Sequence, residues 1–309
     1  MITTVTLNPA LDKLLSVDEI KIGETNRTRC LSTSAAGKGI DVAKVLRDLD
    51  CEVSVTGFLG GDVAPAFVNC FTQDKIQNFF LPIKDSTRTN IHLFDKNGKR
   101  TELLEKGPSV NAEECDALLA QVKTLAEQSS VVTINGSVPG GVNDDYFRKL
   151  VQTAKKSGAI VITDTSGTFL KVSLEEKPHL IKPNRSEMLE LMGKTEAEDA
   201  EIIAFARQIV KDGVPYILVS LGGDGAMLIC ESGVWRGKAP EVEVKSTLGC
   251  GDTMVASLSL SLGKKSPPAE MLKNAIALSS ANAMTFETAH IIMNDYQHLL
   301  TVCTVEKLD

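Results

Sequence analysis

Short apolar runs rich in β-branched residues recur along the chain, and each ends at a glycine or a polar residue. Four of these runs predict strands buried on both faces, at residues 131–134, 159–163, 179–181 and 216–219. Between and after them, apolar residues recur with helical spacing, most clearly at residues 111–128, 144–157, 186–192, 197–212 and 268–285. This alternation predicts an α/β fold in which helices cover a mainly parallel sheet.

Polar residues follow the ends of the predicted strands. The carboxyl ends of parallel strands lie along one edge of a sheet, where open α/β folds bind their ligands. The sequence therefore predicts that one cleft is lined by the following residues: Asn135, Ser137, Asp164, Lys182, Asn184, Ser220 and Asp252.

The first hundred residues show a different pattern. Short alternating segments with turn signals predict a small β lid over the cleft, formed in two parts at about 13–33 and 87–104. No internal repeat or low-complexity linker divides the chain. Residues 1–309 are therefore predicted to form a single domain that carries the lid.

Composition and charge limit the classes of partner. With 309 residues, of which 43% are hydrophobic and 24% charged, the chain can bury a large core without disulfides or metals. The net charge of -7 argues against nucleic acid or an anionic membrane as a partner. The seven cysteines form no C-x-x-C pair, and the four histidines show no metal-ligand spacing. Without a signal peptide or an apolar span of about 20 residues, a cytoplasmic protein with buried thiols is predicted.

The strongest chemical signal is the sequence Gly249-Cys250-Gly251-Asp252, which lies between a strand-like run and a helical run. A helix that begins here points free backbone N–H groups and the positive end of its dipole at one spot, which suits a phosphate. Asp252 is then placed to take a proton from an attacking hydroxyl. The same four residues also fit an ordinary Asp N-cap after a flexible turn.

A second glycine-rich turn, Gly37-Lys38-Gly39, precedes the helical run at residues 40–49. It lacks the first glycine and the final hydroxyl of a P-loop, and no complete dinucleotide-binding fingerprint occurs in the chain. Small residues here would let a ligand approach the backbone, and Lys38 offers a charge for a phosphate or carboxylate. A tight strand-to-helix turn with a solvated lysine is the alternative.

Four motifs occur together and in order: TLNPALD at 6–12, AGKGIDVAKVL at 36–46, IKPNRSE at 181–187 and GCGD at 249–252. In this combination the chain resembles the PfkB, or ribokinase-like, carbohydrate kinases from residue 2 to about residue 290. Within them it is most similar to the 1-phosphofructokinase and tagatose-6-phosphate kinase branch.

The resemblance implies a Rossmann-like, three-layer α/β/α domain with a mainly parallel sheet and a β lid. It also implies an ATP-dependent phosphotransferase that uses magnesium. The acceptor would be a hydroxyl of a ketohexose phosphate, fructose 1-phosphate or tagatose 6-phosphate, and the product a bisphosphate. A catalytically weak, kinase-like sensor of sugar phosphate or nucleotide is the alternative. The presence of Asp252 and Glu187 favours an active enzyme, because a sensor is free to lose them.

Carried over by motif, the resemblance implies that Asp252 is the general base and that Gly249, Cys250 and Gly251 form an anion hole. The acceptor and its phosphate would be held by residues of the first two motifs, the predicted lid and the segment after residue 134: Asp12, Arg27, Gly37, Lys38, Gly39, Asp41, Arg88, Asn90 and Ser137. Taken singly, Asp12 also fits a turn residue, and Arg27 also fits a solvated surface cation.

The resemblance implies that ATP is held by residues of the third motif, a glycine-rich loop and a later helix: Lys182, Asn184, Ser220, Gly222, Gly223, Gly225 and Asn282. It also implies that Glu187 acts on magnesium through water, as the acid of an N-x-x-E motif. Two alternatives stay open. Glu187 also suits the cap of a helix start, and close packing of small residues explains the surroundings of Asn282 equally well.

Some positions depart from the family pattern. Asp41 stands where these kinases usually carry Asn, so a carboxylate that only accepts replaces an amide that can donate. Near a sugar phosphate this predicts repulsion unless Lys38 or a sugar hydroxyl compensates. His92 stands where Lys is common, and Cys250 where Ala or Ser is usual. A homodimer through the lid stays open, because neither lid segment forms an unmistakable apolar patch.

Overall fold

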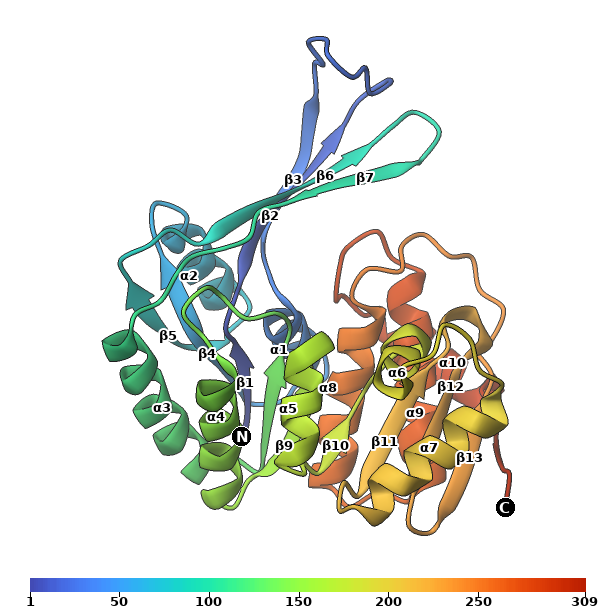
Figure 1. The fold of residues 1–309 in the computed structure, drawn as a ribbon. Helices are drawn as coiled ribbons and strands as arrows, with labels where there is room; N and C mark the ends of the chain where they lie inside the picture. The colour runs from blue at the N-terminus through green and yellow to red at the C-terminus, as the bar shows by residue number, and fades with distance from the viewer.

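A ten-stranded sheet forms the body of the molecule in the computed structural model, which describes residues 1–309 (Figure 1). The strand order is β14-β13-β12-β11-β10-β9-β8-β1-β4-β5, parallel from β5 to β11 and antiparallel from β11 to β14. The strands have the following bounds: β1 Ile2–Thr6, β4 Val53–Gly60, β5 Gln77–Ile83, β8 Val131–Asn135, β9 Ile160–Asp164, β10 Leu180–Ile181, β11 Tyr216–Ser220, β12 Ala226–Cys230, β13 Gly233–Gly237 and β14 Val305–Lys307.

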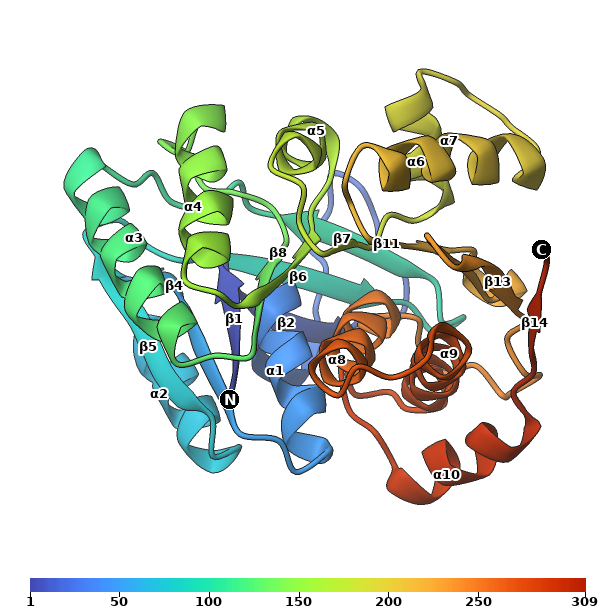
Figure 2. The same ribbon diagram turned by 90° about the horizontal axis from the view of Figure 1, so that it is seen from below.

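Helices cover both faces of this sheet, as Figure 2 shows. One face carries α1 Lys38–Asp48, α2 Ala64–Gln73, α8 Cys250–Gly263, α9 Pro268–Ala283 and α10 Met293–Val302. The other face carries α3 Ala112–Glu127, α4 Asp144–Lys156, α5 Gly167–Glu175, α6 Arg185–Met192 and α7 Asp199–Lys211. The predicted three-layer α/β/α fold class is confirmed.

Local sequence explains why these helices form where they do, and α4 is a clear case. The side chain of Asn143 caps its start by accepting a hydrogen bond from the N–H of Tyr146. Acidic residues occupy the first turn and lysines the last, which complements the helix dipole. Its apolar side, which includes Phe147 and Leu150, is fully buried against the sheet.

A second sheet of four strands, in the order β3-β2-β6-β7, projects from the body (Figure 1). Its strands are β2 Ala10–Ser16, β3 Arg29–Ala36, β6 Arg88–Phe94 and β7 Arg100–Leu104. Because β2 begins shortly after β1 ends, this projecting sheet is attached at the carboxyl ends of the parallel strands. In the first predicted lid segment, strands occupy only the two ends, and residues 17–28 between them form no strand.

Two further findings concern the chain as a whole. All seven cysteines are free, but Cys30 is exposed and Cys51, Cys70 and Cys250 are half-buried, so the prediction of uniformly buried thiols is wrong. Cys30 lies near the exposed start of β3 in the projecting sheet. None of the helices is both long and apolar enough to cross a membrane.

Candidate functional site

The carboxyl ends of the central strands bring several predicted residues to one edge of the body. Thr6 at the end of β1 pairs with Asn135 at the end of β8, and Asn135 pairs with Asp164 at the end of β9. The first turns of α1 and α8 lie at the same edge. A Cβ on Gly39 of α1 would lie 2.4 Å from Thr6 Oγ1, and a Cβ on Gly251 of α8 would lie 3.2 Å from Lys182 Nζ. The predicted gathering of polar strand ends is therefore present in the fold.

The start of α8 provides free backbone donors. Gly249 is the N-cap, with φ 78°, in the left-handed region that glycine adopts without steric cost. The N–H groups of Gly251 and Asp252 donate to no backbone carbonyl. Asp252 lies in the first turn of the helix and not at its N-cap, which excludes the simple Asp N-cap alternative. The arrangement is suited to bind an anion.

Asp252 is a buried carboxyl with no hydrogen-bond partner in the protein, and it is only 8% exposed. Burial raises its pKa well above the ordinary value, and the nearby charge of Asp41 raises the pKa further. The cations of Lys38 and Lys182 oppose this shift. An unpaired carboxyl with a raised pKa is a stronger base than an exposed one, as proton abstraction requires.

An ion-pair cluster lies beside Asp252, in which Asp164 and Lys182 are buried and Lys38 is partly exposed. Asp164 Oδ1 is 3.2 Å from Lys38 Nζ and 3.4 Å from Lys182 Nζ. Burial alone would raise the pKa of Asp164, but the two lysines hold it below its ordinary value. Burial would lower the pKa of Lys38, yet Asp164, Asp252 and a nearby glutamate raise it. Lys38, predicted to bind the acceptor, and Lys182, predicted to bind ATP, thus share the carboxylate of Asp164. The sequence analysis predicted only that Asp164 lines the cleft.

The glycines of the first motif allow α1 to approach the end of β1. A Cβ on Gly39 would lie 2.4 Å from Thr6 Oγ1 and 3.1 Å from Asn135 Nδ2. Gly37 has φ 133°, and a Cβ there would lie 2.8 Å from Thr6 Cγ2. Both glycines are therefore needed for packing, and their contact with a ligand remains a prediction.

Asp41 lies in the first turn of α1 and is buried. Its Oδ1 has no hydrogen-bond partner and lies 3.9 Å from Lys44 Nζ. Burial raises the pKa of Asp41 to about 7, Asp12 adds to the shift and Lys44 opposes it. The nearest compensating cation is therefore Lys44, where the sequence analysis named Lys38.

Asp12 is part of β2 and not a turn residue, and it is held by neighbours on the projecting sheet. Asn90 Nδ2 donates to Asp12 Oδ1 at 2.9 Å, and His92 Nε2 lies 3.2 Å from Asp12 Oδ2. His92 Nδ1 lies 3.1 Å from Glu102 Oε1 on β7. The sequence analysis noted His92 only as a departure from the family pattern.

Arg88 connects the projecting sheet to the body. Its guanidinium donates to the carbonyl of Asn8 at 3.1 Å and to the carbonyl of Glu105 at 3.2 Å. Asn8 in turn donates to Ser137 Oγ at 3.2 Å. Arg27, by contrast, is exposed in the connection between β2 and β3, at the outer end of the projecting sheet (Figure 1). Within this chain the structure does not bring Arg27 to the other candidate residues.

The predicted nucleotide loop is a short 3-10 turn, Gly222–Asp224, directly after β11. Ser220 forms an isolated bridge with Asn184, which places the loop beside the third motif. A Cβ on Gly222 or Gly223 would meet nothing within 4 Å, so this side of the loop is open. A Cβ on Gly225 would lie 2.1 Å from the Gly237 carbonyl, so that glycine is required by packing.

Asn184 and Glu187 form a capping box at the start of α6. Asn184 Oδ1 accepts from the N–H of Glu187 at 2.9 Å, and Glu187 Oε2 accepts from the N–H of Asn184 at 2.8 Å. Capping leaves Glu187 Oε1 free, and Asp164 Oδ2 is buried without a partner. No cluster of three or more metal-ligating side chains exists. Two oxygens of this kind fit magnesium that is bound mainly by water and substrate phosphates.

Asn282 is fully buried in α9. Its Nδ2 donates to the carbonyl of Leu248 at 2.7 Å and lies 3.4 Å from Cys250 Sγ. The amide therefore positions the turn that precedes α8. Its predicted place beside the adenine remains a prediction.

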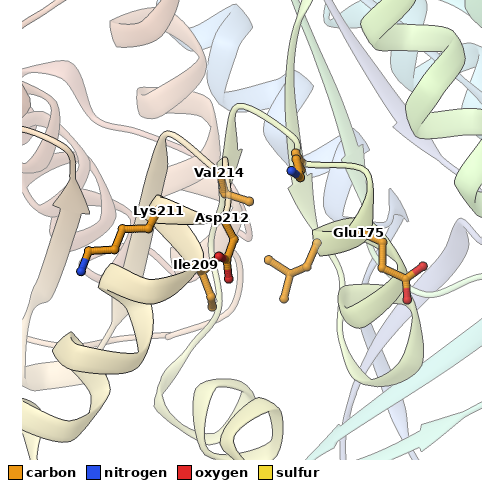
Figure 3. Close-up of a pocket in the computed structure, with 7 residues that line it drawn as sticks. Glu175, Ile209, Lys211, Asp212 and Val214 are labelled. Atoms are coloured by element: carbon orange, nitrogen blue, oxygen red, sulfur yellow. The ribbon is translucent and has the colours of Figure 1, made fainter.

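A separate surface pocket of about 630 Å³ lies between the carboxyl ends of α5 and α7, as Figure 3 shows. Its lining residues come directly before β10 and β11 in the chain: Leu174, Glu175, Lys177, Ile209, Lys211, Asp212 and Val214. Figure 3 shows Lys211 and Glu175 directed to opposite sides of it. The pocket is at the amino ends of the strands and takes no part in the site described above.

Comparison with protein families identifies the class. The family described as pfkB family carbohydrate kinase matches residues 5–293. The chain therefore belongs to this family, as its motifs predicted, and it is a carbohydrate kinase by descent.

Solved structures agree with this assignment. A phosphofructokinase candidate from Staphylococcus aureus is 29% identical, with a TM-score of 0.86, over 100% of this chain and 99% of its own. Phosphofructokinase-2 from Escherichia coli, solved with potassium, is 27% identical, with a TM-score of 0.93, over 97% and 98%. A candidate 1-phosphofructokinase from Thermotoga maritima is 26% identical, with a TM-score of 0.87, over 100% of both chains.

Proposed function

We propose that this carbohydrate kinase transfers the γ-phosphate of ATP to a hydroxyl of a ketohexose phosphate, with Asp252 as the general base. The observation that carries the proposal is the position of Asp252. It lies buried and without a partner in the first turn of α8, beside free backbone N–H groups. Such a carboxylate can accept the proton of a hydroxyl that is bound against it.

The charges around Asp252 suit phosphoryl transfer. As the acceptor oxygen bonds to the γ-phosphorus, Asp252 takes its proton, and the bond to the β-phosphate oxygen breaks to release ADP. The N–H groups at the start of α8 and the ammonium groups of Lys38 and Lys182 stabilise the charge on the transferred group. Glu187 and Asp164 are the carboxylates that would hold the water shell of magnesium bound with the nucleotide, and the metal would supply positive charge to the phosphates.

Two cations at this edge of the body support a substrate that already carries a phosphate. Lys38 lies at the start of α1, and Arg88 lies at the base of the projecting sheet. Escherichia coli phosphofructokinase-2 is also known in complex with fructose-6-phosphate. For this chain we favour fructose 1-phosphate or tagatose 6-phosphate, with the product a bisphosphate.

The projecting sheet is proposed to act as the lid and as the contact between two copies of the chain. Leu31, Leu103 and Leu104 on its outer strands are more than half exposed, at 54%, 54% and 57%. Exposed apolar residues on an uncovered sheet support an interface. The double variant Leu103→Lys and Leu104→Lys is expected to be monomeric in light scattering if this sheet joins the subunits. The use of ATP supports a cytoplasmic reaction.

The central test is a coupled assay of ADP release with fructose 1-phosphate, tagatose 6-phosphate, fructose 6-phosphate and unphosphorylated hexoses. The Asp252→Asn variant is expected to lose activity by about 1,000-fold, while ATP binding measured by calorimetry is retained. The matched control is Asp116→Asn, which changes an exposed carboxylate on α3.

Each outcome of this assay is decisive. Unchanged turnover in Asp252→Asn would rule out the base. Turnover only on unphosphorylated hexoses would overturn the acceptor class. If no sugar is phosphorylated but sugar phosphate or nucleotide still binds, the alternative of a kinase-like sensor is supported. The residue that favours this alternative is Asp41, a carboxylate predicted for the acceptor site.

A further inference from the structure

His92 lies between two carboxylates inside the projecting sheet. It is only 4% exposed, on β6 between β2 and β7. Its Nε2 is 3.2 Å from Asp12 Oδ2, and its Nδ1 is 3.1 Å from Glu102 Oε1. Both ring nitrogens therefore face oxygens of acidic side chains.

This geometry determines the protonation state that satisfies both contacts. A neutral imidazole carries one N–H, so it can donate to only one carboxylate and would present a lone pair to the other. An imidazolium donates to both. We propose that His92 is a positioning residue: as an imidazolium held by Glu102, it orients the Asp12 carboxylate for the acceptor sugar and makes sugar affinity fall as pH rises.

The other groups around the pair support this role. Arg100 Nε lies 3.4 Å from the same Glu102 oxygen that faces His92, so two basic side chains meet this carboxyl group. Asn90 occupies the second oxygen of Asp12 as a donor, so that carboxylate has a fixed orientation. Among the charged groups of β2, β6 and β7, Asp12 and Glu102 contact the ring, and Arg100 contacts it only through Glu102.

The direction of the pH effect follows from the contacts of His92. The hydrogen bond to Asp12 is the largest influence and raises the pKa of His92, burial lowers it, and the charges of Asp12 and Glu102 raise it further. The ion pair is fully formed below the ordinary pKa of histidine and is lost as pH rises through the raised value. Asp12 then keeps its hydrogen bond from Asn90 but loses its ion pair with His92.

The inference rests on the proposed function only where it concerns sugar affinity. It adds a residue to which neither the motifs nor the family comparison assigns a role. The His92→Lys variant supplies a permanent cation at the same place and is the conservative replacement. The His92→Gln variant keeps a hydrogen-bonding side chain and removes the charge.

The first experiment needs no catalysis. Imidazole resonances of the full-length protein are followed by NMR as a function of pH, and those of His92 are identified by their loss in His92→Gln. A His92 pKa above its ordinary value of about 6.5, which falls in Asp12→Asn, is expected. An imidazole that titrates at or below the ordinary value overturns the inference, whether or not the protein is an active kinase.

The second experiment measures kcat and KM for the sugar phosphate from pH 6 to pH 9. His92→Gln is expected to raise KM about tenfold at pH 6 with little change in kcat, because a charge-assisted hydrogen bond is lost. His92→Lys is expected to restore the low KM and to remove the rise of KM with pH. The control is His298→Gln, an exposed residue on α10.

Only differences between these profiles report on His92, because the substrate phosphate titrates equally in all the proteins. An unchanged KM in His92→Gln, or an equal rise of KM with pH in His92→Lys, overturns the positioning role. If the wild type phosphorylates no sugar, the proposed function fails, and the NMR titration still decides the charge state of His92.

Discussion

The carboxyl edge of the ten-stranded sheet and the projecting four-stranded sheet build their parts of the site in different ways. In the body, helices cover both faces, and Asp164 and Asp252 are 1% and 8% exposed. Their chemistry depends on backbone features, namely strand ends and the start of α8. The projecting sheet lacks such cover over much of its length, and Asp12 is held there by side chains of neighbouring strands.

Under the proposed function, this difference corresponds to the two halves of the reaction. Changes at the body edge would act on the transferred phosphate and are expected to lower kcat. Changes in the projecting sheet would act on the acceptor and are expected to raise its KM. Lys38 and Arg88 are the informative pair, because the sequence analysis predicted both for the acceptor site and the structure also pairs Lys38 with Asp164 at the body edge.

After the loss of the base Asp252, the largest effect is expected for Lys38→Met. Its loss leaves Asp164 with one cation and removes a positive charge that acts on Asp252. A fall in kcat of about 100-fold is expected in the ADP-release assay, together with a higher KM for sugar phosphate. Lys149→Met, on the exposed side of α4, is the control. A change confined to the KM for sugar phosphate would return Lys38 to the acceptor half.

Gly39→Ala tests the junction of α1 with the body sheet. The added methyl group would lie 2.4 Å from Thr6 Oγ1, so the helix must shift away from β1. The free energy of unfolding is expected to fall by about 2 kcal/mol in urea denaturation. Gly263→Ala is the matched control, since its Cβ would meet nothing closer than 3.7 Å. Equal stabilities of the two variants would contradict this account of the close approach.

Arg88→Ala tests the projecting sheet. The variant loses a cation on the acceptor side and two hydrogen bonds to backbone carbonyls. The KM for sugar phosphate is expected to rise about tenfold with kcat nearly unchanged. Lys99→Ala, in the exposed turn between β6 and β7, should match the wild type. A loss of kcat without a change in KM would remove the distinction between the two halves.

Asp41→Asn tests one buried carboxyl of α1, and its expected effect is on stability as a function of pH. The raised pKa of about 7 means that the folded protein binds this proton more tightly than the unfolded chain does. The resulting stability is present below the ordinary carboxyl pKa and is lost as pH rises through about 7. At pH 8 the variant should exceed the wild type by up to about 4 kcal/mol in urea denaturation, and the difference should shrink toward zero as pH falls to 4. A difference that does not change with pH would show that Asp41 is not protonated in the folded state.

Much of the fold follows from local patterns. The apolar run before Asn135 forms β8, and the capped amphipathic segment after Asn143 forms α4, both within a residue or two of the prediction. The antiparallel strands β12 to β14 were not predicted. β12 is apolar at all five positions, as a buried parallel strand is, so its sequence gives no sign of an antiparallel direction. The direction of such a strand depends on its connections and not on its composition.

Some residues of the candidate site can likewise be recognised from local sequence, and others cannot. The glycines around α8 and the carboxylate of Asp252 are recognised from one short segment, because backbone donors at a helix start need only local sequence. The capping role of Glu187 could also be predicted from local sequence, because its N-cap partner Asn184 is only three residues away. Asn282 gave no such signal, because its partner Leu248 is distant in the chain.

The sequence by itself determined the alternation of strands and helices, the motifs of a carbohydrate kinase and the helix start that carries Asp252. Only the tertiary structure decided that Lys38 and Lys182 share Asp164, and that His92 bridges Asp12 and Glu102. Secondary structure and caps depend on residues within a few positions of one another. These charge clusters join side chains from separate strands and helices, which meet only after both sheets have assembled.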